Sequence, residues 1–127
     1  MKKVNQKAKK TLDTLTAGLD NAGDHKKIDN TDGVFMAVVV EHIGTDENGP
    51  MFSVAHYYTQ NGDLVADPEM AFLRGFDGNY YPLHFQTGGY FQRAWDVAKG
   101  TFSPRACREQ ATFAGQWMKN ISYQQSI

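Results

Sequence analysis

Residues 56–70, with the sequence HYYTQNGDLVADPEM, determine how the central strands of this chain pair. Asn61-Gly62 is a strong hairpin signal, because both central positions of a type I′ turn need a positive φ. β-Branched and aromatic residues flank it, which predicts two antiparallel strands. With these two residues as the loop, His56 lies opposite Asp67 and Val54 lies opposite Glu69. Pro68 has no N–H donor, so it predicts an edge position or a bulge, and a bulge there would shift this register.

A second hairpin signal follows at Asp77-Gly78, before the aromatic run Tyr80–Gln86. The same counting places Met70 opposite Phe85, Phe72 opposite Leu83 and Glu69 opposite Gln86. Alternation along the strands then predicts one strongly apolar face, which helices should cover. The other face is predicted to collect a polar cluster: His56, Asp67, Glu69, His84 and Gln86.

Three interpretations of this polar cluster stay open. Two imidazoles and two carboxylates could bind a divalent metal ion, since zinc accepts those ligands. They could also perform acid–base chemistry. The third interpretation is a solvated sheet face with a His–Asp cross-strand pair. The sequence has no His-Glu-x-x-His motif, phosphate-binding glycine loop or nucleophile elbow, so we expect no cofactor and no catalytic residue.

Amphipathic runs lie at both ends of the chain. Apolar residues between Val4 and Leu19 repeat at helical spacing, and Ser103-Pro104 is typical of a helix start. We therefore predict a single α+β domain over residues 1–127. It has an antiparallel sheet of four to five strands, with helices at about 4–20 and 104–122 packed mainly on one face. Trp117 and Phe113 should contact Met70, Phe72, Leu83 and Phe85.

Two segments are harder to interpret. Val34–His42 predicts an interior strand that is apolar on both faces. Residues 87–102 leave the choice open, because Tyr90–Val97 fits a last strand or a short helix equally well.

Charge is distributed unevenly along the chain. Residues 1–27 carry a net charge of +4, residues 28–73 carry −8 without one Lys or Arg, and residues 74–127 carry +3, which gives −1 in total. A balanced fold, a cation site and an acidic surface for a basic partner all fit this pattern. The lysines at positions 3, 7, 9 and 10 predict a solvated helix face, with a phosphate-binding face as the alternative. An acidic nucleic-acid mimic that inhibits a host DNA-binding enzyme is a further alternative.

Localisation follows from what the sequence lacks. The basic start has no apolar run behind it, and the longest apolar run, Val34–Val40, is too short to span a membrane. One cysteine, Cys107, rules out an internal disulfide, and we expect a cytoplasmic protein without membrane contact.

The stretch from Ser53 to Met70, with Tyr81-Pro82 and Phe85-Gln86 after it, resembles a small bacterial domain-of-unknown-function family. The shared pattern is His-Tyr-Tyr, then Asn-Gly-Asp-Leu, then Asp-Pro-Glu-Met, and it covers roughly residues 28–97. Members of that family occur on phages, plasmids and conjugative elements. The resemblance implies an accessory protein of a mobile genetic element and no particular chemistry.

The expected function is therefore non-enzymatic binding, with a protein as the partner rather than nucleic acid. The alternative is a metal-dependent protein or enzyme that uses the polar cluster. Phe52, Val54, Tyr58 and Val65 would leave apolar area on the polar face, which a two-fold homodimer would cover. The alternative is that one helix packs on each face, or that residues Tyr90–Phe102 fold over the second one.

Overall fold

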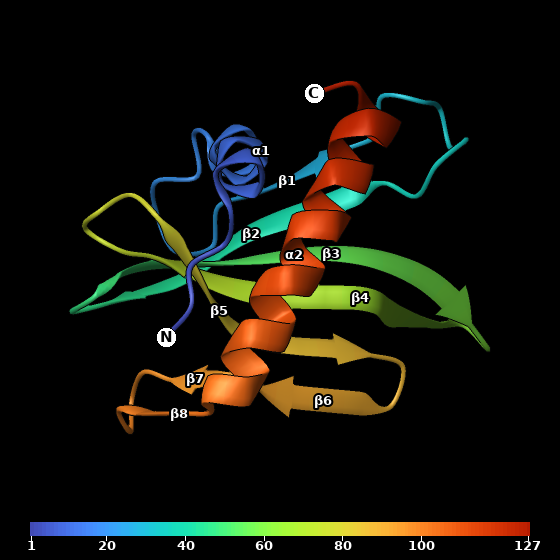
Figure 1. Ribbon diagram of the computed structural model, residues 1–127. Helices are drawn as coiled ribbons and strands as arrows, with labels where there is room; N and C mark the ends of the chain where they lie inside the picture. Colours follow the sequence, from blue (N-terminus) through green and yellow to red (C-terminus); the bar gives the residue numbers. More distant parts are fainter.

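The computed structural model describes all residues, 1–127, as an α+β fold with a helix near each end of the chain. The helices are α1 (Gln6–Thr16) and α2 (Pro104–Gln125). The main antiparallel sheet has six strands rather than the expected four to five, in the order β1-β2-β3-β4-β5-β6 (Figure 1). They are β1 (His25–Ile28), β2 (Val38–Asp46), β3 (Gly49–Gln60), β4 (Asp63–Arg74), β5 (Tyr80–Thr87) and β6 (Tyr90–Arg93).

The turn at Asn61-Gly62 forms as predicted, whereas the loop around Asp77-Gly78 is longer than the predicted two residues, because Arg74 pairs with Tyr80. Asn61 and Gly62 have φ values of 53° and 84°, so Gln60 pairs with Asp63 across a two-residue loop. Each strand of the main sheet pairs with its neighbour along the chain, so this sheet is a simple meander.

Capping residues set where both helices begin. The Asn5 side chain accepts a hydrogen bond from the Ala8 N–H, and the Ser103 side chain accepts one from the Ala106 N–H. The helix α1 is shorter than predicted and begins at Gln6, although Val4 just before it is buried. The helix α2 begins after Ser103 as predicted and continues to Gln125.

Both helices pack on the same face of the sheet and form the main core with it (Figure 1). Trp117 belongs to this core together with Met70 and Phe72, and the Phe113 ring meets the Phe85 ring edge-on, at 5.1 Å between centroids. These contacts were predicted. The expected contact with Leu83 is wrong, because Leu83 packs with Ala71 and Leu73 on the opposite face. A register shift between β4 and β5, after Ala71, makes the difference.

The register between β3 and β4 also departs from the prediction, at the proline. The single residue His56 of β3 faces two residues of β4, Asp67 and Pro68, so a bulge interrupts the ladder. Because proline donates no N–H, this is where a ladder tolerates an extra residue. Beyond the bulge the pairing moves by one, and Val54 pairs with Met70 instead of Glu69.

The bulge changes which side chains share a face. Phe52 and Val54, predicted on the polar face, are fully buried in the core beneath the helices. The opposite face, which we call the second face, carries Val39, Ile43, Met51, Ser53, Tyr57, Glu69, Ala71, His84, Gln86 and Phe91.

The predicted strand at Val34–His42 is also corrected. Strand β2 begins only at Val38, and Val34 before it is 77% exposed. The strand is buried on the helix side alone, since Val38 and Val40 are fully buried while Glu41 is exposed. Its other face belongs to the second face and is not covered by a helix.

Residues 87–102 form strands rather than a helix. After β6 come two short strands, β7 (Trp95–Asp96) and β8 (Thr101–Phe102), which pair with each other. Trp95 and Val97 pack on Ala71, Leu73 and Leu83, so this hairpin covers one end of the second face.

Candidate functional site

Glu69 is the centre of a polar cluster on the second face, although only 5% of its surface is exposed. Its Oε1 accepts hydrogen bonds from His84 Nε2 at 2.8 Å and from Gln86 Nε2 at 2.9 Å. Its Oε2 accepts one from Ser53 Oγ at 2.7 Å. We call these four residues the Glu69 cluster. Strands β3, β4 and β5 each contribute to it, so the sheet register itself assembles the cluster.

The electrostatics of the cluster favour an ionised Glu69. Burial on its own raises the pKa of the Glu69 carboxyl. The hydrogen bonds from His84, Ser53 and Gln86, with the charge of His84, outweigh burial and lower that pKa. A carboxylate with three donors directed at it is held in one orientation.

Tyr57 lies beside the Glu69 cluster. Burial raises the pKa of its phenol, and the negative charges of Glu69 and Glu41 raise it further. The phenol of Tyr57 therefore stays protonated at neutral pH. Glu41 lies nearby and is exposed. Two carboxyl groups, of Glu41 and Glu69, and the phenol of Tyr57 thus share the second face.

His56 and Asp67 are not part of this cluster. The His56 ring points to the helix side and meets the Trp117 ring edge-on, at 5.5 Å between centroids. Burial lowers the pKa of His56, against a smaller raising effect of Asp67. Asp67 accepts a hydrogen bond from Thr87 Oγ1 at 3.3 Å. The structure thus brings together Glu69, His84 and Gln86 of the five predicted residues.

Separating His56 from Glu69 and His84 changes the chemistry that the face can perform. No group of three or more His, Cys, Asp or Glu side chains lies close enough to hold a metal ion. What remains is one carboxylate–imidazole pair, in which the carboxylate fixes the orientation of His84.

A pocket of about 340 Å³ lies next to His84, where the β7–β8 hairpin meets the second face. Most of its walls are apolar and include Ile43, Met51, Phe91 and Trp95. Arg93 also lines it, and its guanidinium lies over the Phe91 ring, 5.3 Å from the ring centroid. The His84 ring packs on the same phenylalanine at 5.1 Å. The second face therefore combines a polar cluster with an apolar hollow at its edge.

Comparison with known protein families places the chain. A family model for a domain of unknown function matches residues 4–127, which is nearly the whole sequence. The chain belongs to the DUF6908 family. No curated protein and no solved structure matches it. No helix of this DUF6908 domain is long and apolar enough to cross a membrane.

Sequence reasoning missed two residues of the site in this DUF6908 domain, Ser53 and Tyr57. The register counted from Asn61-Gly62 has no bulge, and alternation in that register puts both residues on the apolar face, away from Glu69. Pro68 was the signal that could have found them: a bulge there moves the odd-numbered residues of β3 to the side of Glu69.

Proposed function

We propose that the protein is a non-enzymatic binding protein, an accessory of a mobile genetic element, and that it binds a partner protein with its second face. The mobile-element context rests on the resemblance of the stretch around His56–Met70. The observation that carries the binding function is the sheet itself: both helices lie on one face, and the other face is covered only at one end.

The composition of the second face supports a protein partner. Ile43 and Phe91 are exposed at 43% and 47%, and Met51 and Tyr57 on the same face are half-buried. Aromatic residues and methionine are enriched in protein–protein interfaces, while lysine is depleted. Apolar side chains around a satisfied polar centre match that composition.

The Glu69 cluster suits a rigid binding surface better than a catalytic one. A general base must accept a proton from its substrate, and both Glu69 oxygens already accept hydrogen bonds from the protein. A fixed carboxylate holds three side chains from two other strands in place instead.

The test is affinity capture from host cells that carry the element, followed by mass spectrometry. We expect the unaltered protein to retain a defined partner, and Ile43→Asp to lose it, because a buried unpaired carboxylate at an interface is costly. Leu64→Asp is the matched control: Leu64 is also an exposed aliphatic residue, 70% exposed, but it lies by the β3–β4 turn. Thermal unfolding of each variant confirms that it is folded.

Two results would contradict the proposal. One is the recovery of the same proteins with Ile43→Asp as with the unaltered chain. The other is a mass of two chains in sedimentation at micromolar concentration that Ile43→Asp reduces to one, since a second copy would then occupy this face. Two of the four side chains on which the expected homodimer rested, Phe52 and Val54, are buried in the core.

A further inference from the structure

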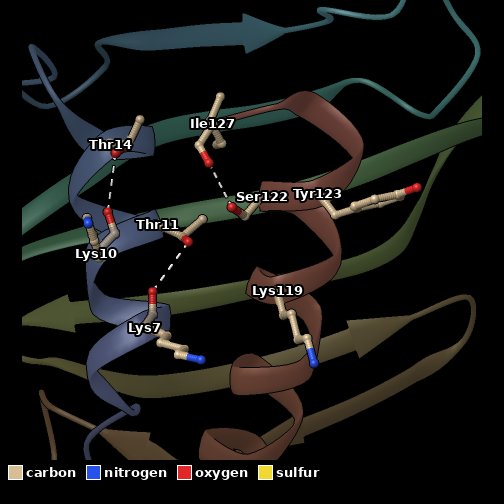
Figure 2. A pocket seen from close by; sticks show the side chains of 8 residues that line it. All are labelled: Lys7, Lys10, Thr11, Thr14, Lys119, Ser122, Tyr123 and Ile127. Carbon is tan, nitrogen blue, oxygen red and sulfur yellow. Dashed lines mark hydrogen bonds between the residues drawn. The ribbon is translucent and has the colours of Figure 1, made fainter.

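A continuous basic groove runs between α1 and α2 on the side of the helices that faces away from the sheet. Two adjoining hollows of about 400 and 590 Å³ form it, and they share Lys7 and Lys119. Figure 2 shows the first hollow, with Lys7 and Lys119 extending from the two neighbouring helices.

The groove concentrates positive charge without any balancing acid. Five lysines line it: Lys2, Lys3, Lys7, Lys10 and Lys119. No Asp or Glu lines either hollow, and none of the five lysines is in an ion pair. Asp13, the acid on α1, is held instead by Lys9 Nζ and the Tyr80 hydroxyl, each at 2.8 Å.

The groove has a fixed shape. The Val4 N–H donates to the Tyr80 carbonyl oxygen at 3.0 Å, and Val4 is buried, so the segment with Lys2 and Lys3 is anchored. The Asn5 side chain lies so close to α2 that a Cβ added at Gly115 would be 2.6 Å from Asn5 Nδ2. The lysines therefore extend from a rigid frame.

We propose that this groove binds the phosphate backbone of a nucleic acid. Its remaining polar lining includes Thr11, Thr14, Ser122, Gln116 and Tyr123. Lysine together with hydroxyl and amide side chains is the set that contacts phosphate oxygens in nucleic-acid complexes. An acidic polypeptide fits less well, because the groove has no Arg or Met and lysine is depleted in protein interfaces.

The groove reads the backbone and not the bases. Single-strand binding without sequence preference uses several stacked aromatic side chains, and Tyr123 is the only aromatic residue along the groove. The net charge of −1 does not oppose this site, because the acids of residues 28–73 lie in the sheet and its turns rather than along the groove.

The experiment is fluorescence anisotropy of a labelled duplex DNA of random sequence, titrated with the full chain at several salt concentrations. Five lysines that each neutralise one phosphate predict a decrease in affinity of roughly 500-fold between 50 and 200 mM salt. Lys7→Ala with Lys119→Ala removes the two lysines shared by both hollows, and should lower the slope of log affinity against log salt by about 2.

The matched control is Lys27→Ala with Lys99→Ala, which removes the same charge from two exposed lysines outside the groove. It should leave the slope unchanged. The proposal fails if the duplex does not bind at 50 mM salt, or if the control pair weakens binding as much as the groove pair. It also fails if polyglutamate binds and DNA does not, since an acidic polypeptide would then be the occupant.

Discussion

The buried carboxylate of Glu69 accepts three hydrogen bonds, so its replacement should change the stability of the fold. Glu69→Gln places an amide N–H₂ where the cluster needs an acceptor, so donors from Ser53, His84 or Gln86 lose their partner. Hydrogen bonds to charged groups contribute about 1.5–3 kcal/mol, so the free energy of unfolding should fall by about that amount. Urea denaturation measures it. Glu41→Gln, an exposed acid on the same face, is the control and should change stability by less than about 0.5 kcal/mol. Equal losses in the two variants would show that the cluster has no special role in stability.

His56 makes stability depend on pH in a predictable direction. Its pKa is lowered in the folded chain, so the unfolded chain binds the proton more readily. The stabilisation is fully present above the ordinary pKa of 6.5 and decreases as the pH falls from there through the lowered pKa. Denaturant unfolding between pH 7 and pH 5 should therefore show decreasing stability, and His56→Phe should flatten that dependence.

The control for this pH dependence is His25→Phe, which replaces an exposed histidine. It should keep the slope of the unaltered chain. A slope that survives in His56→Phe would assign it to another group. Glu69, whose pKa is also lowered, contributes in a separate window: its stabilisation is present above the ordinary pKa of 4.5 and is lost as the pH falls below it.

At the scale of elements, the close contact between Asn5 and α2 predicts that one substitution, Gly115→Ala, affects stability differently with and without the Asn5 side chain. In an exposed helix Gly→Ala stabilises by about 1 kcal/mol, but at Gly115 the new Cβ would displace the Asn5 side chain that caps α1. We expect Gly115→Ala to leave stability unchanged or reduce it in the unaltered chain. In the Asn5→Ala background, the same change should stabilise by up to about 1 kcal/mol. Urea denaturation of the unaltered chain, the two single variants and the double variant gives the coupling free energy between Asn5 and Gly115. A coupling of zero would show that the two residues do not interfere.

The elements differ in how far the sequence could predict them. Turns and caps depend on a few adjacent residues, so Asn61-Gly62 and Ser103-Pro104 were interpreted correctly. The pairs Glu69–Gln86 and Met70–Phe85 were also correct, because no irregularity lies between them. The bulge at Pro68 was recognised as an alternative, but local rules do not choose between an edge proline and a bulge. That choice moved Ser53 into the site and His56 out of it. Strands β6 to β8 are too short for a periodic signal: β6 and β7 depend on their contacts with β5, and β8 depends on its pairing with β7.

At the scale of the whole molecule, the lysines of the groove and the acidic residues of positions 28–73 lie in different parts of the fold. The basic ends of the sequence supply both helices and the groove between them, together with β1 and β5 to β8, and the acidic middle forms strands β2 to β4 with their turns. The helical layer and the second face lie on opposite sides of the sheet. A protein partner on one side and a nucleic acid on the other could therefore be bound together. The capture experiment and the DNA titration test the two sides independently.

The outermost strands of the sheet have a consequence for how copies of the chain behave at high concentration. A strand at the border of a sheet offers unpaired N–H and C=O groups, which can recruit a strand from another molecule and start fibre growth. Here both borders, β1 and β6, are only four residues long. Lys26 and Lys27 occupy the first, and Arg93 ends the second. Short, positively charged borders discourage such growth, so copies crowded together during synthesis should stay separate rather than stack strand upon strand.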